Sequence, residues 1–245
     1  MATKDYFSDH SKLYATFRPT YPEELYAFVF KHVKKFDSAW DCATGNGQVA
    51  QALAKQFRQV EATDISRQQL DNAVKINNIH YSLQGAEQTT FPDKHFDLIT
   101  VGQAMHWFDL PKFYNEANRV AKKDALLAVW GYAVCSVNPN VDEHFNHFYN
   151  HVVGPYWDSA RRMVEEEYSN IPFPFEQIAT PKFSINVEWS LEEFAGYLTT
   201  WSATQKFIKD KNYNPVPDVV KLIRPHWSEK EKVSFPVFLK LGRIV

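Results

Sequence analysis

The sequence predicts an α/β fold built on a doubly wound, parallel β-sheet. Before about residue 135, short apolar segments of strand length alternate with amphipathic segments of helical periodicity. The connections between them are short, and such an alternation folds into parallel strands joined by right-handed helical crossovers. In addition, 44% of the 245 residues are hydrophobic and 16% are aromatic, which is enough apolar surface for a large core.

The first half of the chain supplies the elements of this sheet in order. Each expected strand is a short apolar segment, and each expected helix carries apolar residues at intervals of three and four. We expect strands at 38–43, 59–63, 79–83, 96–101 and 125–130, and helices at 48–57, 66–76 and 111–122.

The pattern changes after residue 135. Helices inserted between late strands would lie over the carboxyl edge of the sheet, where open α/β sheets bind ligands. These helices are candidates for a lid over a second substrate, and ordinary peripheral helices are an equally open alternative. We expect helices within 140–170 and 191–211, a proline-punctuated loop at 171–181, and strands at 182–189 and 233–241.

Composition excludes several classes of protein. Lys and Arg total 27 against 29 Asp and Glu, a formal net charge of -2, so the chain lacks the basic excess that phosphate contacts require. Cys42 and Cys135 cannot form a disulfide framework, and no Cys/His spacing suits zinc. The first ten residues lack a signal-peptide core, and no apolar run spans a bilayer. We therefore expect a cytoplasmic protein without a nucleic-acid, membrane or metal partner.

A glycine-containing turn between the first strand and the first helix is the most informative segment, and it reads WDCATGNGQ over 40–48. The small residues Ala43, Gly45 and Gly47 allow a tight turn and a close approach of the backbone to a ligand at the helix N-terminus. The turn also fits the G-x-G-x-x-G/A pattern of dinucleotide-binding loops. The turn alone therefore does not identify its ligand.

Two carboxylates help to discriminate between ligands. Asp41 ends the first strand, where its charge would repel a pyrophosphate bound at the helix N-terminus. Asp64 ends the second strand and can accept hydrogen bonds from both hydroxyls of a ribose. A phosphate-free nucleoside with a cationic tail fits both carboxylates, which describes S-adenosyl-L-methionine. An isolated Asp41 has a simpler interpretation, as a turn or helix-cap carboxylate.

At this point the sequence resembles the class I S-adenosylmethionine-dependent methyltransferases. DCATGNGQ (41–48) is similar to their glycine motif, with Ala43 in place of the first glycine. ATDIS (62–66) resembles the ribose-binding motif, and QGAEQTTFPDKHFDLIT (84–100) resembles the adenine-side loop and the fourth strand. VGQAMHWFD (101–109) follows that strand.

The resemblance extends toward both ends of the chain. YATFRPTYP (14–22) resembles the N-terminal lid of the small-molecule subgroup typified by trans-aconitate methyltransferase. The match covers about 6–135, with a weaker likeness at 189–203. It implies a Rossmann-like sheet, mostly parallel with an antiparallel last strand, and one domain over 1–245. That domain comprises an N-terminal lid and helix (1–37), a cofactor-binding core (38–135), an inserted acceptor region with one strand (136–232) and the last strand (233–245).

The resemblance also implies roles for the residues that match its motifs. Tyr14 and Arg18 would close over the methionine end of the cofactor, and Gln103 and Ala104 would line the floor beneath the transferred methyl group. The product would be S-adenosyl-L-homocysteine. The full set of implied cofactor-binding residues is Tyr14, Arg18, Asp41, Ala43, Gly45, Gly47, Asp64, Ile65, Ala86, Glu87, Gln103 and Ala104.

The acceptor site is less well specified. His106 has three open roles: a general base, a hydrogen-bond donor to the acceptor, or a packed histidine. Trp107 and Trp130 are candidates for the pocket wall, with burial in the core as the alternative. Arg161 is the candidate cation, and adjacent Arg162 would point to another face of the helix.

The leading hypothesis is methylation of a small molecule, possibly a carboxylic acid, by a monomer or a homodimer. A carboxylate is already ionised at neutral pH, so no catalytic acid–base residue is assigned. The Asn/Asp-Pro-Pro-Tyr motif of nucleic-acid amino-methyltransferases is missing, and MHWF stands in its place. Two alternatives stay open: an NAD-dependent oxidoreductase, and a non-catalytic protein that keeps the nucleoside site.

Overall fold

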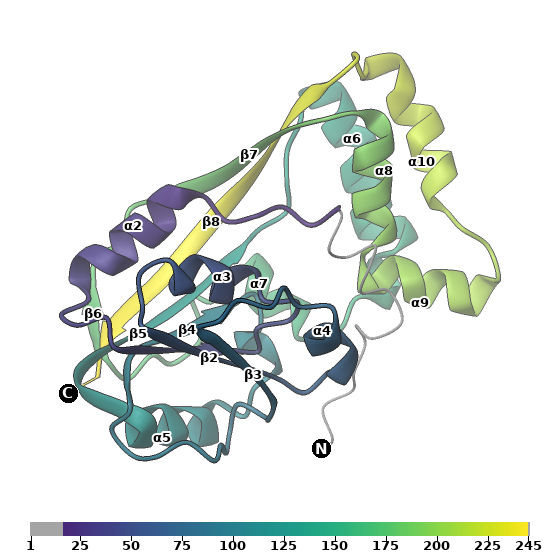
Figure 1. The fold of residues 1–245 in the computed structure, drawn as a ribbon. Helices are drawn as coiled ribbons and strands as arrows, with labels where there is room; N and C mark the ends of the chain where they lie inside the picture. Colours follow the sequence, from purple (N-terminus) through teal and green to yellow (C-terminus); the bar gives the residue numbers. More distant parts are fainter. Residues whose placement is uncertain (1–16, 245) are drawn as a thin grey trace.

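The computed structural model describes residues 17–244 and contains one eight-stranded mixed sheet. The strand order is β3-β2-β1-β4-β5-β8-β6, and β7 pairs with β8 outside this path. The first five strands are parallel, and β8 runs antiparallel to β5. The predicted fold class is therefore confirmed: a mostly parallel, doubly wound sheet with an antiparallel last strand and inserted helices (Figure 1).

The strands follow the apolar segments closely. β1 is buried along its whole length, as expected for a central parallel strand covered on both faces. The strands are β1 (Ser38–Cys42), β2 (Gln59–Asp64), β3 (Ile79–Leu83), β4 (Phe96–Gly102), β5 (Ala121–Tyr132), β6 (Glu176–Ile178), β7 (Phe183–Trp189) and β8 (Glu231–Arg243).

The helices divide between the sheet faces and the inserted region. The α-helices are α2 (Glu23–His32), α3 (Gln48–Ala54), α4 (Arg67–Asp71), α5 (Leu110–Val120), α6 (Pro139–His147), α7 (Arg161–Glu165), α8 (Leu191–Thr199), α9 (Ser202–Lys211) and α10 (Val216–Ile223). Short turns of other helix types are η2 (Met105–Trp107), η3 (Phe148–Val152), η4 (Gly154–Tyr156) and η5 (Arg224–His226).

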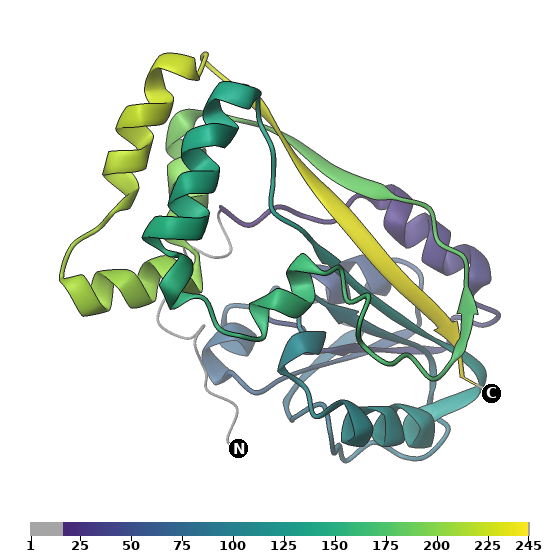
Figure 2. The same cartoon turned by 180° about the vertical axis from the view of Figure 1, so that it is seen from behind.

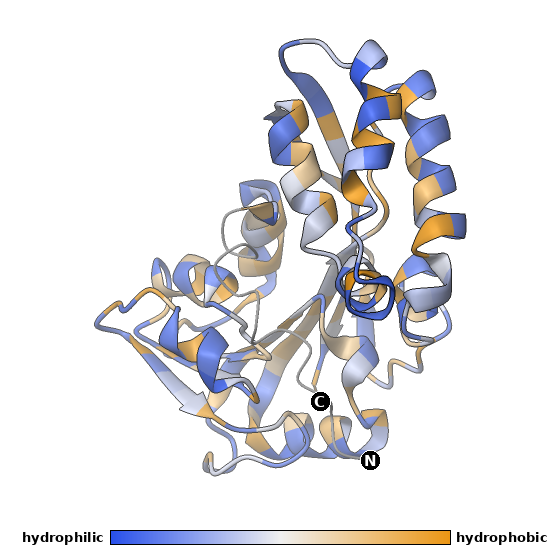
Figure 3. Ribbon diagram, turned by 90° about the vertical axis from the view of Figure 1, so that its right-hand side faces the viewer, coloured by the Kyte–Doolittle hydropathy of each residue, from blue (hydrophilic) through white to orange (hydrophobic). Residues whose placement is uncertain are grey.

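Two hydrophobic cores cover the two faces of the sheet. Successive strand residues point to opposite faces, so Ala128 and Trp130 join the core beneath α2 and α3, while Leu127 and Val129 join the core beneath α5. Figures 1 and 2 show α5 on the opposite side of the sheet from α2 and α3. Hydrophobic residues follow the central strands in Figure 3, whereas the helices above them carry hydrophobic and hydrophilic residues on different faces.

The inserted region extends one end of the molecule beyond the sheet. α6, α8 and α10 gather at the end of β8 that lies farthest from α5 (Figures 1 and 2). A capping box fixes the start of α8, where Ser190 accepts from the amide of Glu193 and the Glu193 side chain accepts from the amide of Ser190. The inserted helices therefore pack on one another and on one end of β8.

Three details differ from the sequence-based expectations. The helix expected over 66–76 is shorter, because α4 spans only Arg67–Asp71. The loop expected at 171–181 contains β6, so the inserted region holds two strands rather than one. β6 forms because its three residues pair with the last residues of β8. α10 falls in a segment for which no helix was predicted.

Gly242 allows the segment before β6 to pack closely on β8. A Cβ atom at Gly242 would lie 2.6 Å from Phe173 Cε1 and 2.7 Å from Phe175 Cβ. We expect Gly242→Ala to lower the free energy of unfolding by about 1–3 kcal/mol, because a packed core resists an added methyl group. Gly85→Ala is the control, since its Cβ would meet only Glu87 Oε2 at 3.5 Å. Equal urea midpoints for the two variants would contradict this prediction.

Candidate active site

The glycine loop joins β1 to α3 through three residues in the left-handed region of backbone space. Gly45 and Gly47 have φ values of +58° and +83°, which glycine adopts without strain. Ala43 has φ +56°, so the residue that replaces the family's first glycine keeps the conformation that glycine favours. Gly47 is also the residue that immediately precedes α3, so the loop leads directly into the N-terminus of this helix.

Asp64 holds this loop in place from the end of β2. Its Oδ2 accepts a hydrogen bond from the Gly45 amide, and its Oδ1 accepts one from the Ser66 amide, both at 2.8 Å. Ser66 in turn caps the N-terminus of α4 by accepting from the Gln69 amide. Each carboxylate oxygen has a second lone pair, so Asp64 retains the capacity to accept from ribose hydroxyls. The residues of the loop thus fit a nucleoside.

Asp41 lies beneath the loop rather than on its surface. Its side chain is 1% exposed, and its two oxygens accept from the hydroxyls of Thr44 and Thr100. Burial raises the pKa of Asp41 to about 7, and the two threonine bonds only partly offset this rise. A ligand on the loop would meet Thr44 and the loop amides before it met Asp41.

Ile65 of the ribose-binding motif and the two adenine-side residues take different environments. Ile65 is 46% exposed directly after Asp64. Ala86 is buried in the core beneath α5. Glu87 accepts from the amide of Asp109, the residue that caps α5. The contact of Ile65 with the cofactor, and of Ala86 and Glu87 with its adenine, stays a prediction.

A pocket opens at the carboxyl end of β4, beside the glycine loop. β1 and β4 are neighbouring parallel strands, so the segments that follow them leave the sheet side by side. The pocket has a cavity volume of about 60 Å³ and opens to solvent at its mouth. It is lined by Arg18, Gln103, His106, Trp107, Trp157, Asp158, Arg161, Tyr197, Trp201 and Ser202.

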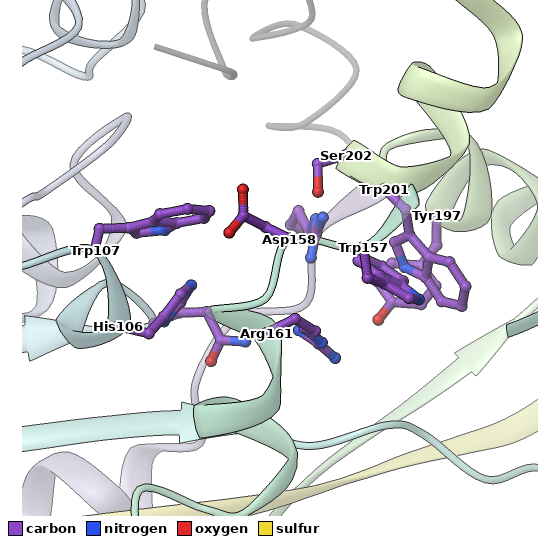
Figure 4. Close-up of a pocket in the computed structure, with 10 residues that line it drawn as sticks. His106, Trp107, Trp157, Asp158, Arg161, Tyr197, Trp201 and Ser202 are labelled. Carbon is purple, nitrogen blue, oxygen red and sulfur yellow. The ribbon is translucent and has the colours of Figure 1, made fainter. Parts of the chain in front are cut away.

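This pocket brings together five residues that the sequence singled out: Arg18, Gln103, His106, Trp107 and Arg161. They come from the N-terminal segment, the end of β4, η2 and α7, and Figure 4 shows their labelled members around one space. The sequence did not assign the remaining five pocket residues. Trp157 and Trp201 belong to the aromatic residues after position 140, a composition that suits either a closed acceptor pocket or an ordinary core, and no pattern distinguished Asp158, Tyr197 and Ser202.

Gln103 occupies the turn at the end of β4. Its φ is +56°, and its side-chain amide continues the ladder between β4 and β5. Its Oε1 accepts from the Tyr132 amide at 2.8 Å, and its Nε2 donates to the Tyr132 carbonyl at 3.3 Å. Ala104 follows and is buried. The side chain of Gln103 is thus bonded to β5, and its backbone amide donates to the Trp130 carbonyl at 2.8 Å.

The two arginines of the pocket are held by aromatic residues. Arg18 Nη1 donates to the Tyr132 hydroxyl at 2.7 Å, and its guanidinium lies 5.4 Å from the centre of the Tyr197 ring. The Arg161 guanidinium lies 5.1 Å from the centre of the Trp157 ring. Adjacent Arg162 points away, with an 81% exposed side chain that pairs with Glu166. Only one of the two adjacent arginines therefore reaches the pocket, as the helical geometry predicts.

His106 is a neutral member of the site. Its Nδ1 lies 2.8 Å from the Tyr168 hydroxyl. Burial, reinforced by the positive charge of Arg161, lowers the pKa of His106 to about 3, although Asp158 partly opposes this effect. The imidazole therefore carries no charge at neutral pH.

The prediction that Trp130 lines the acceptor pocket is not supported by its position. Trp130 is fully buried on the α2 face of the sheet, where Tyr21 and Tyr26 meet it edge to face. Residue parity along β5 explains this placement, because Trp130 shares a face with Ala128. Tyr14 lies outside the described residues.

Within residues 17–244, no three His, Cys, Asp or Glu side chains are arranged to hold a metal ion. None of the helices in the same range is long and apolar enough to cross a membrane.

The glycine loop follows β1 and the pocket lies at the end of the neighbouring strand β4. Comparisons with known proteins identify the family of the chain. Residues 40–129 match the model of a methyltransferase domain. A protein of Dictyostelium discoideum named as a methyltransferase is 34% identical over 249 residues, which cover 98% of this chain and 95% of that protein. The chain therefore belongs to the S-adenosylmethionine-dependent methyltransferases.

Solved structures support the same assignment. A structure from Anaeromyxobacter dehalogenans, described as a type II methyltransferase, has a TM-score of 0.87 and 32% identity, covering 94% of this chain and 99% of that one. The YcgJ protein of Bacillus subtilis, at 19% identity and a TM-score of 0.53, covers 90% of this chain and 97% of its own and shares the fold. Family membership decides between the two cofactor hypotheses in favour of S-adenosylmethionine rather than NAD.

The buried carboxyl group of Asp41 predicts a pH dependence of stability. In the unfolded chain its pKa returns to about 3.9, so between about pH 4 and pH 7 the unfolded state loses a proton that the folded state keeps. The free energy of unfolding should therefore fall as the pH rises through this window, by at most roughly 4 kcal/mol from this group. We expect Asp41→Asn to gain stability relative to the wild type between pH 5 and pH 8 in urea unfolding. If the difference in the free energy of unfolding between Asp41→Asn and the wild type does not change with pH, the prediction is wrong.

Asp64 provides a direct test of cofactor binding. Asp64→Asn removes the charge and one acceptor, so we expect it to weaken binding of S-adenosylhomocysteine by about 1–3 kcal/mol in calorimetric titration. Asp71→Asn is the matched control, because Asp71 is exposed at the end of α4 and its substitution removes the same charge. Equal affinities for the two variants would remove Asp64 from the binding site.

Proposed function

We propose that this methyltransferase acts on a small carboxylic acid bound in the pocket beyond β4, in the manner of the subgroup typified by trans-aconitate methyltransferase. The observation that carries this proposal is the pair of guanidinium groups, Arg18 and Arg161, in a pocket with aromatic walls. Guanidinium groups bind carboxylates with paired, charge-assisted hydrogen bonds.

Arg161 is the better placed of the two cations. Trp157 packs against its guanidinium, and its Nε donates to the Tyr149 hydroxyl at 3.1 Å. These contacts orient the group while leaving it on the pocket wall. Asp158 adds a negative charge that opposes the charge of Arg161, and Lys206 Nζ lies 3.8 Å from the Asp158 carboxylate oxygen Oδ2. The pocket therefore favours an anion near Arg161.

The chemistry of a carboxylate acceptor suits this set of residues. When bound, S-adenosylmethionine supplies a methyl group on a positively charged sulfur. A carboxylate is ionised at neutral pH, so no side chain has to remove a proton from it. The task of the chain is then alignment and exclusion of water, which the Trp107, Trp157 and Trp201 rings serve by enclosing the acceptor.

The net charge of the chain also fits a small-molecule acceptor. With a formal net charge of -2 and no basic excess, the chain suits a free small-molecule acceptor better than a nucleic acid. The cytoplasmic location, the lack of a membrane partner and the monomeric or homodimeric state stay predictions.

The acceptor class can be tested with S-adenosylhomocysteine production. The panel contains trans-aconitate, benzoate with benzamide as its uncharged counterpart, and a matched alcohol and amine. We expect product only with the acids. Arg161→Gln should raise the KM for the best acid by about 10- to 100-fold, because it removes a charge-assisted hydrogen bond. Arg162→Gln is the control, since Arg162 faces solvent.

The acceptor panel tests the class of acceptor, and the two arginine variants test the role of Arg161. Product with the alcohol or amine but with no acid would overturn the carboxylate assignment. An equal effect of the two arginine variants would remove Arg161 from acceptor recognition, even if the acids are substrates.

A further inference from the structure

Tyr168 is placed under the pocket by an unusual turn at the end of α7. Glu167 and Tyr168 are consecutive left-handed residues, with φ values of +51° and +55°. The Tyr168 amide donates to the Met163 carbonyl at 2.8 Å, which closes the turn. Its ring is fully buried and meets Phe238 of β8 edge to face at 5.0 Å. Side chains other than glycine and asparagine seldom adopt this conformation, and it persists where the surroundings impose it.

The position of Tyr168 determines which atom carries the shared hydrogen. Its hydroxyl lies 2.8 Å from His106 Nδ1, and no other acceptor for the phenol hydrogen is within hydrogen-bond distance among residues 17–244. A buried hydroxyl hydrogen needs an acceptor. The phenol therefore donates its hydrogen to Nδ1. Burial also raises the pKa of Tyr168 well above its usual value, so the phenol keeps this hydrogen.

An imidazole that accepts at Nδ1 and is neutral must carry its hydrogen on Nε2. The charged groups that face His106 are Arg161 and Asp158, of which the arginine has the larger effect and disfavours a second proton. Figure 4 shows the far end of the His106 ring pointing into the pocket, between Trp107 and Arg161.

We propose that His106 recognises the acceptor as a fixed hydrogen-bond donor through Nε2–H, and that Tyr168 is the positioning residue that sets this tautomer. The identity of the acceptor group rests on the proposed function. In that case Nε2–H binds one oxygen of the acceptor carboxylate. A lone pair of the other oxygen forms the new bond to the methyl carbon, the carbon–sulfur electron pair stays on sulfur, and no proton moves. His106 therefore takes part without acting as a base.

The tautomer can be read without any acceptor. Two-bond ¹⁵N–¹H correlation spectra distinguish the two neutral tautomers and the charged ring, and the signal of His106 among the nine histidines is the one lost in His106→Gln. We expect the Nε2–H form in the wild type from pH 6 to pH 8, and an increased share of the Nδ1–H form in Tyr168→Phe. A charged ring, or an Nδ1–H form in the wild type, would overturn the proposal.

Two histidine variants test the role in recognition. The amide of His106→Gln places its NH2 near the position of Nε2, whereas that of His106→Asn reaches only the position of Nδ1. With the acid that shows the highest kcat/KM, we expect KM to rise at least about 10-fold in His106→Asn and within about 3-fold in His106→Gln, with smaller changes in kcat. Loss of kcat in both variants, with an acidic limb in the pH profile, would instead identify a general base.

The two proposals fail in different ways. If no acid on the panel is methylated but the spectra show the Nε2–H tautomer, the carboxylate assignment fails. The donor role of His106 is then tested by comparing His106→Asn and His106→Gln with the panel compound that is methylated instead. If acids are methylated and His106→Asn and His106→Gln raise KM equally, the donor role fails and the carboxylate assignment stands.

Discussion

The antiparallel pairing of β8 with β5 is the constraint on which the acceptor pocket depends. Trp130 pairs with Leu239 and Tyr132 with Val237, so the last strand completes the sheet beside the strand that precedes the inserted region. β6 also pairs with β8, so the segment that carries Arg161 and Tyr168 is held at one end by β5 and at the other by β6. The parallel strands thus position the cofactor loop, and β8 positions the helices that face it.

The sequence predicted the parallel core because short segments of strand length alternate with segments of helical periodicity, and because its loop carries the glycines that a left-handed turn needs. The sequence could not predict which face of the sheet Trp130 points to, because β5 carries apolar residues on both faces and their alternation gives no signal. Nor could it predict the turn at Tyr168, since two consecutive left-handed residues, Glu167 and Tyr168, carry no glycine or asparagine signal. β6 was missed because its pairing depends on residues at the far end of the chain. Local patterns determine local structure, and the pocket arises from contacts between segments that are distant in the sequence.

The charged side chains lie at different depths around the glycine loop and the pocket. The carboxyl group of Asp41 is buried below the cofactor loop, and the Asp64 carboxylate accepts from loop amides, so neither acidic group enters the pocket lining. The pocket lining itself combines the two cations Arg18 and Arg161 with the Asp158 carboxylate and the neutral His106.

The distribution of the pocket residues along the chain has a consequence for folding. Arg18 precedes the whole sheet, Gln103 and His106 follow β4, and Trp201 lies more than ninety positions further on. Contacts with such long sequence separation form only after the intervening chain has been ordered. The glycine loop, by contrast, needs only β1, β2 and α3, which are close in sequence. The glycine loop therefore depends on contacts that are local in the sequence, whereas the pocket depends on contacts that span most of the chain.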